Sequence, residues 1–271
     1  MDYQCTAIVL RTYRLNESDK ILHLYSKEHG PIQCIAKGAY RVNSKFNAKA
    51  QILNCLDLLL ASGRNLDIVK EARSIQAFPR INSNYEALTL ACFTIDVLNH
   101  IAINDDHYDE LFNLITNYLR DLELICSKPQ VPSLELQILF TCKYLWQLIC
   151  ILGYKPDLDT CSLTNTRRNA DQIPQYFDLE NGAVTSSRAY KELVRKNPYQ
   201  DSIRELKPGV FSTLLQLEQN LNLTNIERST LSIEHTFKFL HKHLEYRLHK
   251  EFKSWKLVEQ ILNPSLSMQA A

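Results

Sequence analysis

Hydrophobic positions in about the first 78 residues alternate with polar ones, with the period of two that β-strands produce. The alternation is clear at Leu22-His23-Leu24, and turn-forming clusters such as Ser62-Gly63-Arg64-Asn65 separate the apolar runs. Five such runs occur, at Cys5–Arg11, Lys20–Tyr25, Pro31–Ala36, Ile52–Leu60 and Leu66–Ile75. Short strands with a longer insert after the third predict a small antiparallel barrel such as an OB-fold.

After Pro79 the hydrophobic period changes to that of α-helices. Ser83-Asn84-Tyr85-Glu86 has the order of a capping box and predicts the start of the first helix. Further helices are predicted at 108–126, 132–153, 187–196, 209–222 and 229–262, whereas residues 156–185 look irregular. The pattern predicts an α+β protein with a barrel domain at 1–79 and a mainly helical domain at 80–271, the latter with an irregular insertion at 156–186.

The last predicted helix has an apolar stripe and, opposite to it, a basic face. The cations of this second basic face are Lys238, Lys242, Arg247, Lys250 and Lys253. His241 and His249 fall on the same side and are expected to be solvated, because His241-x-His243 lacks the spacing of a helical metal site. This face is either an ordinary solvated helix surface or an extension of a binding site for a polyanion.

The formal net charge of +1 conceals an uneven distribution of charge along the chain. Residues 1–80 carry +5, residues 81–160 carry −7, and residues 161–271 carry +3. A polyanion would therefore bind to a local patch. The eight cysteines have no short paired spacing, which is typical of reduced thiols, and the N-terminus lacks a secretion signal, so we expect a cytoplasmic protein.

Motifs for nucleotide chemistry are absent from the sequence. The six glycines are too far apart to form a phosphate-binding loop, a dinucleotide fingerprint or a nucleophile elbow. No arrangement of serine, histidine and aspartate supports a catalytic triad, and we expect no enzymatic activity.

Residues 29–56 contain no acidic side chain and carry four regularly spaced cations, Lys37, Arg41, Lys45 and Lys49. A basic segment within a β-domain favours binding to a phosphate backbone, although a solvated surface loop has the same composition. Tyr40 lies among these cations and is a candidate for stacking on an unpaired base. Three more candidate DNA-binding cations, expected on the adjacent barrel surface, are Arg11, Arg14 and Lys20.

The same region closely resembles the opening of the RecO family of bacterial recombination mediators. The resemblance lies in Ala7-Ile8-Val9-Leu10-Arg11, Glu17-Ser18-Asp19-Lys20-Ile21-Leu22, Tyr25-Ser26, His29-Gly30 and Ala36-Lys37-Gly38-Ala39-x-Arg41-x-x-Ser44-Lys45. It implies an N-terminal OB-fold, a helical domain and a zinc-ribbon-like insertion. It also implies a DNA-repair protein that binds single- and double-stranded DNA, anneals complementary strands and, with RecR, helps to load RecA. The loading takes place on DNA coated by single-strand binding protein, whose acidic tail the family contacts.

The chain departs from the family at the zinc site, for which relatives carry two Cys-x-x-Cys pairs. Here the four ligand positions hold Cys161, Thr164, Thr185 and Arg188. One thiolate cannot hold tetrahedral zinc, so we predict that the metal and any other cofactor are absent.

Two other functions fit the residues taken without the resemblance. The helical domain and the acidic middle of the chain are compatible with a non-enzymatic scaffold for protein interactions. An OB-fold is equally compatible with RNA binding.

Overall fold

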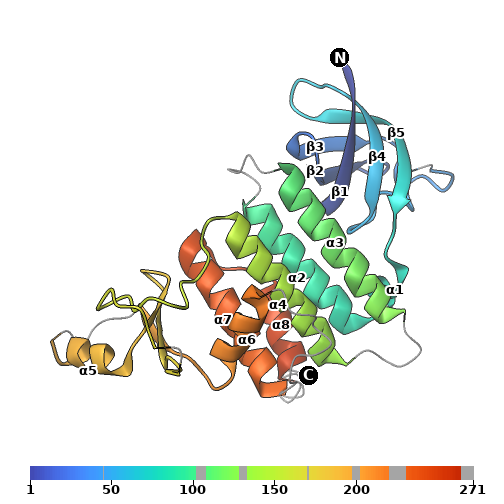
Figure 1. Ribbon diagram of the computed structural model, residues 1–271. Helices are drawn as coiled ribbons and strands as arrows, with labels where there is room; N and C mark the ends of the chain where they lie inside the picture. The colour runs from blue at the N-terminus through green and yellow to red at the C-terminus, as the bar shows by residue number, and fades with distance from the viewer. Residues whose placement is uncertain are drawn as a thin grey trace. The chain divides into compact units, whose positions relative to one another are not determined.

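The computed structural model describes residues 1–44, 46–101, 108–127, 133–169, 171–196, 202–219 and 230–263. The chain forms two compact units (Figure 1). The first unit contains Met1–Pro132 and Phe252–Ala271, and the second contains Ser133–Glu251. The domain boundary predicted near residue 79 falls inside the first unit.

The first unit begins with a closed five-stranded barrel, which confirms the predicted fold class. Its strands are β1 (Asp2–Arg14), β2 (Lys20–Ser26), β3 (Gly30–Ala36), β4 (Cys55–Ala61) and β5 (Asp67–Gln76). They are ordered β1-β2-β3-β5-β4, β1 also pairs with β4, and β3 and β5 are parallel. The strand start predicted at Ile52 is wrong, because Leu53 has a φ of 75° and cannot continue an extended chain.

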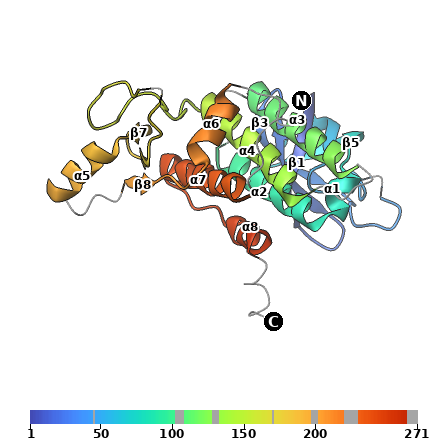
Figure 2. The ribbon, with the colours of Figure 1, turned by 60° about the horizontal axis from the view of Figure 1, so that its bottom comes forward.

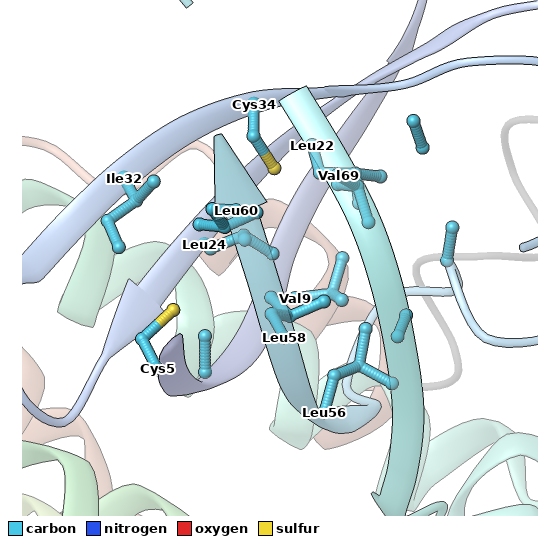
Figure 3. Packing of buried hydrophobic residues seen from close by; sticks show 14 of the residues in the cluster. Cys5, Val9, Leu22, Leu24, Ile32, Cys34, Leu56, Leu58, Leu60 and Val69 are labelled. Carbon is cyan, nitrogen blue, oxygen red and sulfur yellow. The ribbon is translucent and has the colours of Figure 1, made fainter. Parts of the chain in front are cut away.

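The middle of strand β1 is buried on both of its faces. Ala7 and Val9 point into the barrel with Leu24, Leu58 and their neighbours (Figure 3). The alternate residues Ile8 and Leu10 are 0% and 3% exposed. Helix α2 packs against β1 and α3 packs against β2, so helices cover the outer face of these strands. This burial joins the barrel and the helices that follow it into one unit.

Four helices complete the first unit: α1 (Pro79–Ser83), α2 (Tyr85–Ile101), α3 (Tyr108–Cys126) and α8 (Trp255–Leu262). The start of α2 is capped by Asn84, whose side chain accepts a hydrogen bond from Ala87 N at 2.8 Å, so the expectation that Ser83 would be the cap is wrong. The segment that includes the start of α8 packs in this unit: the rings of Phe252 and Trp255 lie 6.1 and 5.5 Å from that of Phe93.

The second unit is built on three packed helices, α4 (Leu134–Ile151), α6 (Val210–Glu218) and α7 (Thr230–Leu248) (Figure 2). It also holds α5 (Ser187–Lys196) and a small sheet with the order β7-β6-β8, formed by β6 (Tyr176–Asp178), β7 (Ala183–Thr185) and β8 (Ile203–Glu205). The region expected to be irregular therefore contains two short strands. Helix α4 is long and apolar enough to cross a membrane, but a core helix of a globular unit meets the same criteria, and 56% of α4 is buried.

The single final helix predicted over 229–262 is wrong. Helix α7 ends at Leu248, His249 has a φ of 50°, and α8 begins only at Trp255. Lys250 N donates a hydrogen bond to Glu245 O at 3.3 Å, which closes the helix end in a Schellman arrangement. The cations of the second basic face are therefore not presented by one helix.

Candidate nucleic-acid interface

Strand register brings cations together at one end of the barrel. Arg14 of β1 pairs with Lys20 of β2, and Lys20 pairs with Ala36 of β3. Lys37 follows Ala36 directly and begins the connection to β4. Three strands therefore end in a row of cations at the place where residues 37–54 leave the barrel.

Two backbone hydrogen bonds fix the start of this connection to the turn between β1 and β2. Gly38 N donates to Asp19 Oδ1 at 2.7 Å, and Tyr40 N donates to Ser18 O at 2.9 Å. The bond from Gly38 is the main cause that lowers the pKa of the Asp19 carboxyl. Gly38 has a φ of 67°, and the stem of Arg41 lies 3.3 Å from where a Cβ of residue 38 would be. Glycine therefore lets the backbone turn tightly beneath Arg41.

The side chains of Arg14, Lys37 and Arg41 are exposed at this end of the barrel. Tyr40 is 39% exposed, and the centre of its ring lies 5.4 Å from Arg14 Cζ and 5.0 Å from Lys20 Nζ. These distances are those of cation–π contacts. We call Arg14, Lys37, Tyr40 and Arg41 the barrel rim. Its cations can reach phosphates, and Tyr40 gives the rim an aromatic surface beside them.

Two of the predicted DNA-binding lysines are held by backbone carbonyls. Lys20 is 5% exposed, donates a hydrogen bond from Nζ to Ala50 O at 3.0 Å, and has its pKa lowered by burial. The expectation that Lys20 lies on the barrel surface is wrong, because its long side chain crosses to the 37–54 connection. Lys49 is half-buried and donates to Ala72 O of β5 at 2.6 Å. Both lysines stabilise the shape of the connection.

Other residues of this region have different surroundings. Arg11 forms an ion pair with Asp96 of α2 at 2.5 Å, and Asp96 also accepts a hydrogen bond from the Ser254 hydroxyl at 2.8 Å. Arg11 thus links the barrel to the helices of its unit. Phe46 packs against the barrel core, and Lys45 lies outside the described residues.

Tyr13 is an exposed aromatic residue that the sequence reasoning missed. It is 46% exposed and pairs with Ile21 across the strands, and its ring lies 5.0 Å from that of His23 in an edge-on arrangement. Strict alternation from the inward-facing Ala7 and Val9 would place Tyr13 inside the barrel, but a register shift between Val9 and Arg11 turns it to the outer face. The charge of Arg11, two residues earlier, is the signal in the sequence for that face.

The second basic face divides into residues with different roles. Lys238 is half-buried, and Lys242 pairs with Glu245 at 3.2 Å. Arg247 donates to Glu180 O at 3.0 Å and lies against Gly182, so it fastens the β6–β7 turn to α7. Lys250 and Lys253 are exposed beyond the end of α7.

The two histidines near Arg247 are buried, which corrects the expectation that His241 is solvated. His241 is 5% exposed, and burial lowers its pKa to about 3. His243 is 0% exposed, its Nε2 lies 2.9 Å from Tyr154 O, and burial lowers its pKa to about 4. Both side chains belong to the interior of the second unit, whereas His249 is exposed.

The positions aligned with the zinc ligands of the RecO family lie on two neighbouring turns. Cys161 Sγ accepts a hydrogen bond from Ser186 N at 3.4 Å, and the hydroxyls of Ser162 and Thr185 are 2.7 Å apart. The Thr185 hydroxyl is thus engaged, and the Arg188 side chain is a cation that is 93% exposed. One thiol with such neighbours does not fit tetrahedral zinc. Within the described ranges, no three His, Cys, Asp or Glu side chains form a group that could hold a metal.

Burial alone would raise the pKa of the Cys161 thiol, but hydrogen bonds outweigh this effect. The Thr164 hydroxyl and the backbone N–H groups of Ser186, Leu163 and Thr164 lower it to about 7. Burial raises the pKa of each of the other seven thiols. Cys161 is therefore set apart chemically from the other cysteines.

Comparison with known proteins places both parts of the chain in one family. Residues 1–78 match the family described as recombination protein O N terminal, and residues 82–256 match recombination protein O C terminal. The chain is similar to the DNA repair protein RecO of Cutibacterium acnes, with 32% identity over 162 residues that cover 59% of this chain and 64% of that relative. It is 30% identical to DNA repair protein RecO of Bifidobacterium longum subsp. infantis over 186 residues, covering 67% of this chain and 72% of the relative. With DNA repair protein RecO of Desulfitobacterium hafniense it shares 25% identity over 263 residues, covering 96% and 90% of the two chains. Because the two matches together span nearly the whole chain, the chain belongs to the RecO family.

Proposed function

We propose that the protein acts in DNA repair and recombination by binding the sugar–phosphate backbone of single- and double-stranded DNA at the barrel rim. The observation that carries this proposal is the row of exposed cations, Arg14, Lys37 and Arg41, around the half-exposed ring of Tyr40. Each cation can neutralise one phosphate and release its counterion. Membership of the RecO family supports DNA as the polyanion.

Strand annealing follows from how such a rim would hold DNA. Contacts to phosphates position a strand without reading its bases, so the base edges stay free to pair with a complementary strand. Lys20 donates a hydrogen bond to the carbonyl of Ala50, and Lys49 donates one to the carbonyl of Ala72. These bonds hold the connection between β3 and β4 against the barrel. The reaction needs no covalent step, and we propose that the protein is not an enzyme and works without zinc.

The proposed partners come from the family. With RecR, the protein would help to load RecA onto DNA that is coated by single-strand binding protein, and it would contact the acidic tail of that protein. These events would take place at the nucleoid in the cytoplasm. The binding of phosphates by exposed cations of the barrel rim is the part of this proposal that the residues of the chain support directly.

A salt titration tests the role of the barrel rim. We expect the triple variant Arg14→Ala, Lys37→Ala and Arg41→Ala to bind single-stranded DNA more weakly and to flatten the plot of log affinity against log salt by about 2 units, since each lost phosphate contact removes about 0.7. Fluorescence anisotropy with a labelled oligonucleotide measures this slope. The matched control is Lys27→Ala: Lys27 is exposed in the β2–β3 turn, at the opposite end of these strands. If the triple variant had the same slope as the unsubstituted protein, the barrel rim would not be the site that binds DNA.

An annealing assay tests the activity itself. The protein should speed the pairing of complementary oligonucleotides without any nucleotide, and the triple variant should lose this effect. Repeating the assay with strands coated by single-strand binding protein, with and without RecR, tests the proposed partners. No acceleration under any of these conditions would contradict the proposed function.

A further inference from the structure

The second unit contains a cavity of about 540 Å³ that the proposed function does not use. It lies between the two turns that correspond to the family's zinc positions and residues 166–169 and 172–175. Its lining includes Cys161, Thr164, Arg167, Arg168, Ser186 and Arg188. A cavity of this size is large enough for a small organic ligand.

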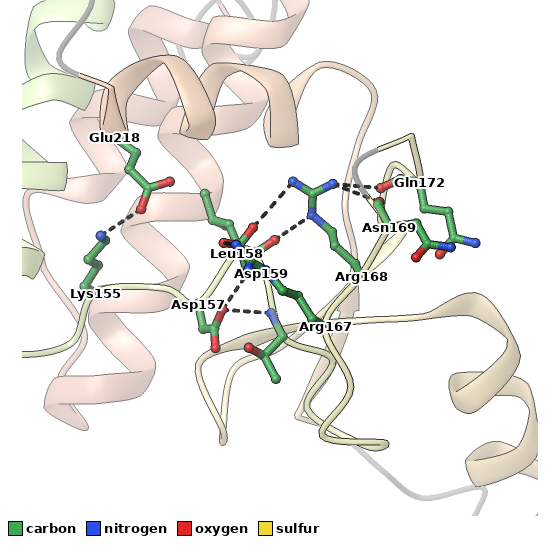
Figure 4. A network of polar contacts seen from close by, with 10 residues as sticks. Lys155, Asp157, Leu158, Asp159, Arg167, Arg168, Asn169, Gln172 and Glu218 are labelled. Carbon is green, nitrogen blue, oxygen red and sulfur yellow. Dashed lines mark hydrogen bonds and ion pairs between the residues drawn. The ribbon is translucent and has the colours of Figure 1, made fainter.

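The residues that line the cavity include three arginines and no carboxylate. Arg168 is fixed: its guanidinium donates to the carbonyls of Leu158, Asn169 and Gln172 (Figure 4), and its side chain is only 15% exposed. Arg167 and Arg188 are 81% and 93% exposed. The surroundings of the cavity are therefore suited to an anion.

The carboxylates nearest to these arginines are weak competitors for an incoming anion. Asp159 lies 3.4 Å from Arg167 and 3.7 Å from Arg168, and Glu192 lies 3.5 Å from Arg188. Asp159 and Glu192 are more than half exposed, and exposed ion pairs of this length contribute little stability. A doubly charged ligand can displace them without leaving a buried charge unpaired.

Neutral donors complete the cavity. The Thr164 and Thr166 hydroxyls lie 2.7 Å apart on its wall. The Ser186 hydroxyl accepts a hydrogen bond from Ala189 N at 3.2 Å and so caps α5, whose first residues, Ser187 and Arg188, line the cavity. The N–H groups at a helix start favour a negative charge, and they add to the effect of the arginines here.

We propose that this cavity binds a phosphate monoester, with Arg167 and Arg188 as its cationic contacts and the threonine hydroxyls as neutral ones. Guanidinium groups bind phosphate oxygens in pairs, and a monoester offers three such oxygens. A concave site of this size accepts a terminal group, whereas a phosphate within a continuous strand needs an open groove on both sides. The ligand is therefore either the phosphorylated end of a nucleic-acid strand or a free mononucleotide. This inference goes beyond the proposed function and does not depend on the barrel rim.

Binding measurements can separate these two sources of phosphate. The probes are a short oligothymidine with a 5′-phosphate, the same strand with a 5′-hydroxyl, and thymidine 5′-monophosphate, each titrated into the full chain that carries the triple substitution in the barrel rim. We expect the 5′-phosphate to strengthen binding of the strand at least tenfold if strand ends are the ligand. Saturable binding of the mononucleotide, with no preference between the two strands, would identify the free nucleotide. If neither the phosphorylated strand nor the mononucleotide binds better than the hydroxyl strand, the proposal is overturned.

Substitutions locate the ligand in the cavity. The double variant Arg167→Gln and Arg188→Gln should lose at least tenfold in affinity for the ligand that binds. Arg195→Gln is the matched control, because Arg195 is an exposed arginine of the same helix that does not line the cavity. Equal losses in both variants would point to a general charge effect and contradict the assignment.

A second readout uses the thiol that lines the cavity. Bound ligand should slow the alkylation of Cys161 several-fold, whereas the alkylation of Cys126, which lies outside the cavity, should be unchanged. Because this measurement follows a single residue by mass spectrometry, it reports the position of the ligand even when the affinity is modest. A ligand that binds without protecting Cys161 would place it elsewhere and overturn the proposal.

Discussion

The barrel rim and the cavity of the second unit are both rich in cations, but they use them differently. At the rim, the lysines that turn inward bind backbone carbonyls, while Arg14, Lys37 and Arg41 face the solvent along strand ends. Around the cavity, Arg168 binds three carbonyls, while the exposed side chains of Arg167 and Arg188 stand at the wall of a concave site. An open row suits a continuous chain of phosphates, and a cavity suits a single terminal group.

The comparison shows that a basic residue can have either of two roles within one region. A cation that donates to several carbonyls holds the backbone together, and its removal affects stability. A cation that faces solvent contributes little to folding and is available to a ligand. Substitutions of both kinds of cation test this division of roles in each region.

The largest effect is expected for Arg168. Arg168→Met removes its donors to three carbonyls and its contact with the Phe211 ring, 4.7 Å away. The Leu158 carbonyl loses a charged hydrogen bond in a partly buried place, and the Asn169 and Gln172 carbonyls lose theirs nearer the solvent. We expect the free energy of unfolding to fall by about 3 kcal/mol. The neighbouring exposed variant Arg167→Met should change it by less than about 0.5 kcal/mol. Urea unfolding of both variants measures the difference, and equal losses would contradict the assignment of roles.

A pH-dependent effect is expected in the interior of the second unit. The pKa of His243 is lowered from its ordinary value of 6.5 to about 4 in the folded chain, first by burial and then by the charge of Arg247. Between these values the unfolded chain binds the proton and the folded chain does not, so stability is full above pH 6.5 and decreases as the pH falls toward 4. The loss is on the order of 3 kcal/mol.

The matched variant for this test is His243→Gln, whose side chain can still donate to Tyr154 O but does not titrate. It should flatten the decrease in unfolding free energy between pH 6.5 and 4. The buried His241 supplies part of the remaining slope, because its pKa is lowered to about 3. An unchanged slope in the variant would show that His243 is not the titrating group.

A smaller effect separates the two kinds of lysine at the barrel. Lys20→Met should lower the free energy of unfolding by about 1 kcal/mol, since it removes the hydrogen bond to Ala50 O. It should leave the salt dependence of DNA binding unchanged. Lys37→Ala should change the free energy of unfolding little, because its side chain is exposed. It should flatten the plot of log DNA affinity against log salt by about 0.7 units. Thermal unfolding of the two variants tests the expected changes in stability, and anisotropy titrations test the expected changes in the salt dependence of DNA binding.

The smallest change concerns reactivity alone. Because the pKa of Cys161 is about 7, its thiolate fraction, and with it the rate of alkylation, should be half-maximal near pH 7 and nearly constant above pH 8. The pKa of Cys126 is raised by burial to about 11, so its rate should still be rising at pH 9. Peptide mass spectrometry after timed alkylation compares the two. Parallel profiles would show that the hydrogen bonds to Cys161 Sγ do not stabilise its thiolate.

Much of the first unit was predictable from local patterns. Alternation along residues 5–75 marked five strands, and the switch to a helical period after Pro79 marked the helices, because burial on one face imposes a regular spacing. The break between α7 and α8 was not predictable in this way. His249 adopts the left-handed backbone conformation that usually requires glycine at a helix end, so the sequence carries no signal for the break. The apolar spacing also continues past it, through Phe252 and Trp255.

The sequence by itself determined the barrel, the helical remainder, the family and the concentration of cations between Glu28 and Asp57, because these depend on the order and spacing of residues. Only the tertiary structure decided which cations face the solvent. Lys20 reaches a carbonyl that is 30 residues away, and Arg247 reaches one that is 67 residues away, so their roles depend on chain segments that meet only after folding. The cavity beside Cys161 has the same origin, since its walls come from turns and a helix start that are separate in the sequence.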